Sequence, residues 1–186
     1  MKRILLTIIL FLFLAAPGIG QDQRAEWGMT KDEVKQVESG QPDEGVYDGI
    51  SYMNYEKKVE GLRATKTYGF DQEGRLFQIE YTIVPARSDR AGSYTRVKDM
   101  LIREYGRPNL QIVSPATSRM EWQQGDMTIR FAIDSADARI SVLYVNTPMY
   151  ENLVRSRLLL MCNELEKERL ERSRRKNVEM ISIVSE

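Results

Sequence analysis

Two segments of the chain alternate apolar and polar residues, and this pattern constrains the fold more than any other feature. In the segment 75–84 the apolar positions are Phe77, Ile79, Tyr81 and Ile83, separated by Gln78, Glu80 and Thr82. In the segment 127–133 they are Met127, Ile129, Phe131 and Ile133, separated by Thr128, Arg130 and Ala132. Successive side chains of a strand point to opposite faces. Each segment therefore predicts an antiparallel strand with one buried face and one solvent-exposed face.

The order of elements around these strands occurs twice. A short helix at about 31–38 precedes extended segments at about 50–59, 62–70 and 75–84, and a second helix near 93–105 precedes segments at 119–123, 127–133 and 139–146. Helix and strand signals in this order favour an α+β fold in which an antiparallel sheet carries helices on one face. We predict a tandem domain over 21–148, built from two helix-plus-three-strand repeats at about 24–86 and 91–146.

The first helix has a clear start signal. Thr30 and Glu33 have the spacing of a capping box, in which the Thr hydroxyl accepts the Glu33 N–H and the Glu33 carboxylate accepts the Thr30 N–H. Met29 and Val34 flank the cap at the spacing of a hydrophobic staple. The pattern fixes where a helix begins and carries no chemistry of its own.

The N-terminus predicts a bacterial signal peptide at residues 1–20. Lys2 and Arg3 precede an apolar run at 4–16, and Gly18-Ile19-Gly20 places small residues where signal peptidase cleaves. We therefore expect cleavage after Gly20 and a periplasmic or secreted protein. The run is shorter than the roughly 18 residues of a membrane span, and no lipobox cysteine follows it, so no stable membrane insertion is expected after cleavage.

Charge and composition narrow the range of partners and cofactors that the chain is expected to bind. Without Lys2 and Arg3 the chain has 25 basic and 27 acidic residues, a balance that gives no reason to expect nucleic acid. Histidine is absent, and no calcium loop or Gly-rich phosphate loop occurs. We expect no metal and no cofactor. The one cysteine, Cys162, allows no internal disulfide and is interpreted as a small buried apolar residue on a helix.

Residues 149–186 predict a long C-terminal helix and tail. Its apolar stripe is formed by Tyr150, Leu153, Val154, Leu158, Met161 and Leu165, and residues 164–176 are mostly charged. Two interpretations stay open: a docked helix whose last turns project into water, or a helix that pairs with a partner or forms an oligomer. The stripe lasts under three heptads, which disfavours a long coiled coil. The role of the tail at 177–186 stays open as well.

The polar strand faces are the best candidate for a binding surface. They lie opposite the face that the helices must cover, and tyrosine suits interfaces because it combines a large area with a polar tip. A simpler interpretation is that the tyrosines cover the edge of the sheet. The candidate partner-binding residues are Tyr52, Tyr55, Arg63, Thr65, Gln78, Glu80 and Arg130.

The alternative of an enzyme depends on three carboxylates. Asp43, Glu44 and Asp48 cluster between the first helix and the first predicted strand, where acid and base roles would need carboxylates with separated pKa values. Loops are commonly acidic for solvation alone. We expect no catalytic residue, and a carboxylate-dependent hydrolase remains the second alternative.

Short motifs add a resemblance to known proteins. Trp27-Gly28-Met29-Thr30 leading into a helix, Tyr105-Gly106-Arg107-Pro108, Trp122 and Leu143-Tyr144 resemble the tandem helix-plus-sheet architecture of the β-lactamase inhibitor proteins (BLIP-like) and of the SmpA/OmlA-like lipoprotein of the outer-membrane barrel assembly machinery. The resemblance implies a small exported α+β domain that binds a protein. We therefore expect a non-catalytic envelope or periplasmic protein that acts as a protein-binding or assembly module, with an inhibitor of a secreted or periplasmic hydrolase as the first alternative.

Overall fold

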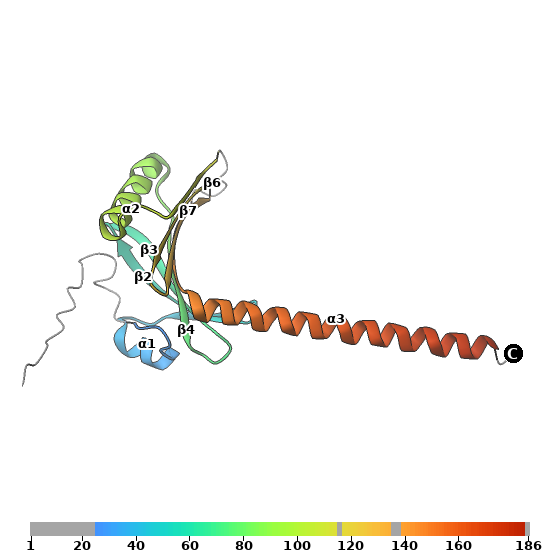
Figure 1. The fold of residues 1–186 in the computed structure, drawn as a ribbon. Helices are drawn as coiled ribbons and strands as arrows, with labels where there is room; N and C mark the ends of the chain where they lie inside the picture. The colour runs from blue at the N-terminus through green and yellow to red at the C-terminus, as the bar shows by residue number, and fades with distance from the viewer. Residues whose placement is uncertain (1–24, 115–116, 135–138, 185–186) are drawn as a thin grey trace, which may run out of the picture.

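The computed structural model describes residues 25–114, 117–134 and 139–184 (Figure 1). The predicted signal peptide at 1–20 lies outside these residues. The elements, in chain order, are α1 (Lys31–Val37), β1 (Asp43–Tyr47), β2 (Ile50–Val59), β3 (Leu62–Phe70), β4 (Leu76–Ile83), the short helix η2 (Arg87–Asp89), α2 (Arg90–Tyr105), β5 (Leu110–Val113), β6 (Thr117–Gln124), β7 (Met127–Asp134), β8 (Arg139–Asn146) and α3 (Thr147–Val184).

The eight strands form one antiparallel sheet in the order β1-β2-β3-β4-β8-β7-β6-β5. The predicted α+β class, with its antiparallel sheet and long C-terminal helix, is confirmed. The two halves meet along β4 and β8, so each half runs outward from the centre to an edge. Each half carries four strands, one more than the three predicted. The additional strands are the short edge strands β1 and β5. The sequence pattern did not reveal them because they lack the alternation of buried and exposed positions that identifies the other strands.

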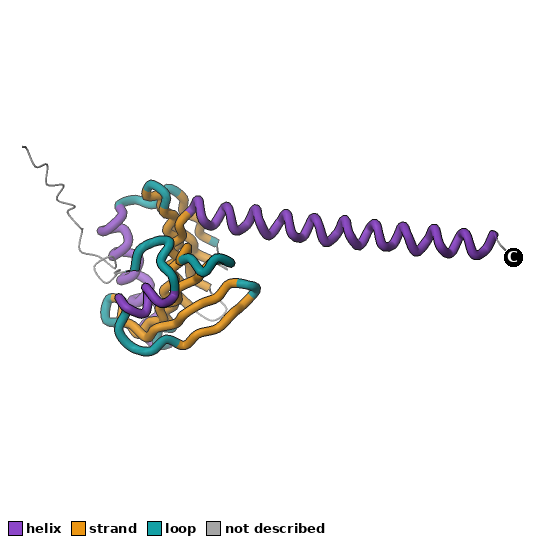
Figure 2. The backbone as a smooth tube through the Cα atoms, turned by 90° about the horizontal axis from the view of Figure 1, so that it is seen from below, coloured by secondary structure: helices purple, strands orange, loops and turns teal. Residues whose placement is uncertain are grey.

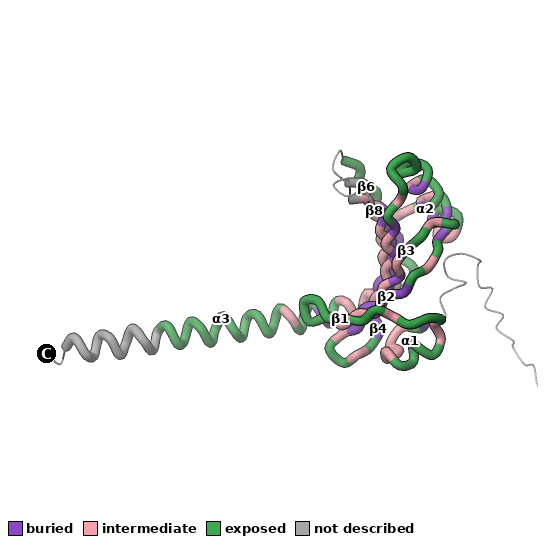
Figure 3. The backbone as a smooth tube through the Cα atoms, turned by 180° about the vertical axis from the view of Figure 1, so that it is seen from behind, coloured by how far each residue is buried: buried purple, intermediate pink, exposed green. Residues whose placement is uncertain are grey.

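The two faces of the sheet differ in what covers them. Helices α1 and α2 lie over one face, here called the covered face, and α3 leaves from the other, here called the open face (Figures 1 and 3). The main core lies between the two helices and the covered face, where Val34 of α1 and Leu101 of α2 pack with Tyr68 and Trp122 of the strands. All four of these side chains are fully buried.

The capping box predicted at the start of α1 is confirmed. The Thr30 N–H donates to the Glu33 carboxylate at 2.7 Å, and the Glu33 N–H donates to the Thr30 hydroxyl at 3.4 Å. Met29 and Val34, the predicted staple residues, both pack into the core. The cap and the staple together fix the register in which α1 lies on the sheet.

The predicted alternation in β4 holds for Ile79, Tyr81 and Ile83 but is wrong for Phe77. The β3–β4 register shifts at Gly69 and Phe70, because Gly69 pairs with Gln78 whereas Phe70 pairs with Leu76. An irregularity of this kind reverses the side-chain alternation on one strand. Leu76 therefore joins the main core, and Phe77 lies outside it and stacks on Tyr150 of α3, with 6.4 Å between ring centroids.

The first turns of α3 are docked and the remainder projects from the domain (Figure 2). Leu153 is buried, as is Val145 of the neighbouring β8, and an Nη1 N–H of Arg157 donates to the Asp48 carboxylate at 2.9 Å. From Leu158 to Arg172 every side chain is exposed. The prediction that Cys162 is buried is therefore wrong, because it lies on the part of α3 that projects beyond the sheet. No helix in the described ranges is long and apolar enough to cross a membrane.

Candidate functional site

The open face is the side of the sheet opposite α1 and α2, and the first turns of α3 contact it at one corner. Strand pairing places polar side chains from β2 to β6 side by side across it, because residues paired in an antiparallel ladder point to the same face. The register gives one continuous row across the face, formed by Asn54, Thr67, Glu80, Leu143, Arg130 and Glu121.

Six of the seven predicted binding residues lie on this face. Their place follows from the strand pairing, and each is at least partly exposed; they are Tyr52, Arg63, Thr65, Gln78, Glu80 and Arg130. Tyr55 is a correction. It lies on the covered face, is 3% exposed, and meets Tyr68 edge to face at 5.9 Å. Tyr52 and Tyr55 are three positions apart in one strand, so they must point to opposite faces.

Cross-strand hydrogen bonds hold the side chains of the open face in place. The Ser141 hydroxyl donates to the Glu80 carboxylate at 2.6 Å, and the Thr67 hydroxyl donates to the Asn54 side-chain carbonyl at 2.8 Å. Each bond joins neighbouring strands, so the polar groups are ordered before anything binds. A preordered surface loses less conformational entropy when a partner docks.

A group of three charged residues on β6 and β7 lies on the open face. Glu121 Oε2 accepts from Arg119 Nη2 at 2.7 Å and from Arg130 Nε at 3.0 Å. Partial burial would raise the pKa of Glu121, but the hydrogen bonds from the two guanidinium groups outweigh it and lower this pKa. We call this group the arginine cluster. It holds two positive charges against one negative charge.

Only Arg130 of this cluster was predicted, although the sequence contains a signal for the other two. Gly125-Asp126 has the composition of a two-residue hairpin turn, and counting outward from Gln124 and Met127 on either side of it pairs Glu121 with Arg130, as the β6–β7 ladder does. Arg119 lies two positions before Glu121 and therefore on the same face. The hairpin register thus identifies the cluster, whereas composition does not.

Helix α3 borders the arginine cluster. The guanidinium carbon of Arg130 lies 6.0 Å from the ring centroid of Tyr150, and the same ring stacks on Phe77. Tyr150 therefore joins the first turn of α3 to both halves of the sheet. A molecule lying on the open face would meet the flank of α3 at this corner.

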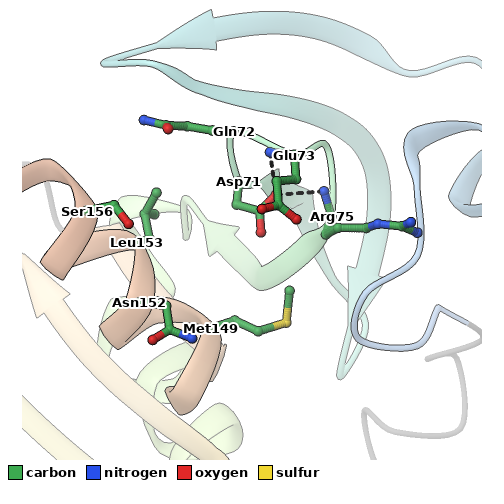
Figure 4. A pocket seen from close by; sticks show the side chains of 8 residues that line it. All are labelled: Asp71, Gln72, Glu73, Arg75, Met149, Asn152, Leu153 and Ser156. Carbon is green, nitrogen blue, oxygen red and sulfur yellow. Dashed lines mark hydrogen bonds between the residues drawn. The ribbon is translucent and has the colours of Figure 1, made fainter.

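A cavity of about 290 Å³ lies where α3 meets the turn between β3 and β4 (Figure 4). It is lined by Asp71, Gln72, Glu73, Arg75, Met149, Asn152, Leu153 and Ser156. The Asp71 carboxylate accepts the N–H groups of Glu73 at 3.0 Å and of Arg75 at 2.9 Å. These bonds stabilise the turn itself. The cavity therefore lies along the contact between α3 and the β3–β4 turn, and its lining residues show no catalytic arrangement.

The three carboxylates considered for catalysis do not converge. Asp43 and Glu44 are neighbours on β1 and point to opposite faces. Glu44 pairs with Lys35 at 2.6 Å, and the hydrogen bond from Lys35 lowers its pKa, whereas a general acid needs a raised pKa. Asp48 pairs with Arg157. Among the described residues, no group of three or more His, Cys, Asp or Glu side chains gathers to hold a metal ion.

A second charged group is buried on the covered face beneath the end of α1. Glu38, 3% exposed, accepts from Lys66 at 2.8 Å and from Lys57 at 2.7 Å, and it also accepts the hydroxyl of Tyr68. Burial would raise the pKa of Glu38, but hydrogen bonds from Lys57, Lys66 and Tyr68 together outweigh it and lower this pKa. The group is enclosed, so it fastens α1 to β2 and β3 and does not face a ligand.

Comparisons with known proteins give little to transfer. No protein-family model matches the chain, and no curated protein matches it. Among solved structures it is similar to a DUF4309 family protein, YjgB, from Bacillus subtilis subsp. subtilis str. 168, with 15% identity and a TM-score of 0.42. That similarity covers 63% of this chain and 78% of the other. Neither fold nor function is inferred from it.

Proposed function

We propose that this protein is a non-catalytic protein-binding or assembly module and that its partner docks on the open face of the sheet. One observation carries the proposal: α1 and α2 leave one side of an eight-stranded sheet uncovered, and that side is lined with ordered, half-exposed polar groups. Uncovered sheet faces of this size are natural surfaces for a protein partner.

The proposal includes export to the bacterial envelope or beyond it. This part is supported by the sequence alone, through the basic residues Lys2 and Arg3, the apolar run that follows and the small residues at 18–20. Expression of the full chain in a bacterial host, followed by fractionation and intact-mass measurement, is expected to give an exported protein that begins at Gln21. A full-length cytoplasmic product would contradict it.

The binding surface is tested by matched substitutions on the two sides of the molecule. Thr82→Arg and Ser141→Arg place bulk in the middle of the open face, and Thr95→Arg places the same bulk on the exposed side of α2. After capture of partners from an envelope extract of the source organism, we expect the open-face variants to lose the partner that Thr95→Arg retains. Equal capture by all three variants would contradict the proposed surface.

The role of α3 in binding is tested with a shortened chain that ends after Arg157. This chain keeps Tyr150, Leu153 and Arg157, which dock α3, and removes the exposed part of the helix. If the shortened chain captures the same partner, the open face is sufficient. If capture is lost while the chain stays folded, α3 is part of the binding surface.

A further inference from the structure

The arginine cluster has more hydrogen-bond donors than its own carboxylate can accept. An arginine side chain has five N–H donors in a planar fork. Arg130 uses its Nε on Glu121, and in the described part of the chain neither of its terminal NH₂ groups donates to a protein acceptor. The Arg119 Nε is buried there without a partner. Two guanidinium groups therefore share one carboxylate and leave a net positive charge.

The side chains beside the cluster are aliphatic. Strand pairing places Leu110 next to Glu121 and Ile112 next to Arg119 on one side, and these two side chains are 44% and 45% exposed. On the other side Leu143 of β8 pairs with Arg130. Charged groups inside an apolar rim become strongly interacting when a partner covers the rim and removes water.

The first half of the open face lacks this arrangement. Arg63 and Glu56 form a one-to-one pair at 2.8 Å, and both side chains are mostly exposed, at 84% and 63%. Exposed pairs of this kind contribute little to stability or binding. Lys58, which pairs with Arg63 across β2 and β3, adds a further exposed positive charge to this half. The arginine cluster therefore differs from the first half in burial, because its side chains are only 25% to 41% exposed.

We propose that the arginine cluster is the anchor point of the open face and that it accepts an acidic side chain from a protein partner, flanked in the partner by aliphatic or aromatic residues. Arginine suits this role because its planar fork binds carboxylates in a bidentate manner. The apolar neighbours of the acidic residue pack on Leu110, Ile112 and Leu143. This inference rests on the proposed function, because it names the chemistry of the partner at that same face.

The test uses a random library of 12-residue peptides displayed on phage and selected on the purified chain 21–186. We expect the selected peptides to be enriched in Asp or Glu next to Leu, Ile, Val or Phe. On Arg119→Glu and on Arg130→Glu, their affinity is expected to fall at least about tenfold. It is also expected to weaken as salt is raised, because the contact is between charges.

Arg103→Glu is the matched control, since it makes the same change at an exposed arginine of α2, on the other side of the sheet. It is expected to leave the peptide affinity within about twofold of the unchanged protein. Arg63→Glu makes the change on the open face outside the cluster and is expected to lower the affinity less than either cluster variant. Arg130→Lys keeps the charge and removes the fork, so an intermediate loss is expected. Arg119→Gln and Arg130→Gln replace the Glu variants if either of those fails to show cooperative thermal unfolding.

Each remaining outcome contradicts the inference. Recovery of no peptide, or of peptides without acidic residues, overturns it. Peptides that lose affinity on Arg63→Glu but not on the cluster variants overturn it while leaving the open face as the binding surface. Peptides indifferent to every open-face substitution count against both the inference and the proposed function.

Discussion

Glu38 connects the end of α1 to the sheet by accepting hydrogen bonds from three side chains, Lys57, Lys66 and Tyr68. Lys66 lies 1% exposed beneath it and also sits over the ring of Tyr68 at 4.9 Å. A buried ammonium group without a counter-charge is costly, because the protein interior solvates charge poorly. The Glu38 carboxylate therefore stabilises the fold mainly by neutralising the Lys66 ammonium group, and less through its hydrogen bonds.

Glu38→Ala is expected to lower the free energy of unfolding by about 3 kcal/mol, because it removes the carboxylate that pairs with the buried Lys66 ammonium group. Urea denaturation of the variant measures this loss. Glu73→Ala, in the exposed turn between β3 and β4, is the control and is expected to change stability by less than about 0.5 kcal/mol. A loss no larger than that of the control would mean that the buried cluster does not hold α1.

The same carboxylate gives an expected pH dependence. The pKa of Glu38 is lower in the folded chain than its ordinary value, so the unfolded chain takes up the proton first as pH falls. The stability that Glu38 contributes is therefore complete above about pH 5 and is lost as pH falls through the folded pKa. In denaturation measured between about pH 3 and 5, Glu38→Gln is expected to show a shallower loss than the unchanged protein. An identical slope would contradict this assignment.

Among single helices and strands, the sequence predicted those whose structure depends on residues close together in the chain. The capping box predicted the start of α1, and strict alternation predicted β7 and most of β4. Phe77 could not be placed from alternation, because the register shift that turns it outward arises from the pairing of β3 with β4. The edge strands β1 and β5 were missed because each pairs on one side only and is too short to show a period.

The binding surface was likewise predictable where the pattern lies within one strand and not where it depends on pairing between strands. Its polar residues were predictable from the alternation that also predicted the core, and Tyr55 was misplaced only because its spacing from Tyr52 was not applied. The arginine cluster could not be found from one strand, since it combines β6 and β7 and borders α3. Long-range pairing, which composition does not contain, decides which charges meet.

Helix α3 gives a prediction at the element scale, because its first turns are part of the fold. Phe77 is buried and stacks on Tyr150, and Leu153 of the same helix is buried as well. A chain that ends after Asn146 loses Tyr150 and Leu153 and is expected to lose about 2 to 4 kcal/mol of stability. A chain that ends after Arg157 is expected to stay within about 1 kcal/mol of the full chain. Urea denaturation of both chains measures the difference, and equal stabilities would contradict the docking of α3.

At the scale of the whole molecule, a sheet domain carries one projecting helix of 38 residues (Figures 1 and 2). At 1.5 Å per residue the helix is about 57 Å long. Small-angle X-ray scattering is expected to show an elongated particle whose maximum dimension falls by about 40 Å when residues 158–184 are removed. A maximum dimension that the truncation leaves unchanged would mean that α3 does not project in solution.

The two halves of the sheet leave the same side uncovered, and this arrangement, more than any single residue, supports the binding proposal. Helices α1 and α2 each cover their own half, so the open face continues across β4 and β8, apart from the corner where the first turns of α3 are docked. The polar row on it contains residues from both halves. A partner that binds there would be held by both repeats at once.

Site-specific photo-crosslinking tests this central claim most directly. A benzophenone side chain placed at Thr82, in the middle of the open face, is expected to form a covalent adduct with the partner in intact cells of the source organism. The same side chain placed at Thr95, on the exposed side of α2, is expected to form none. Adducts from Thr95 and none from Thr82 would contradict the account.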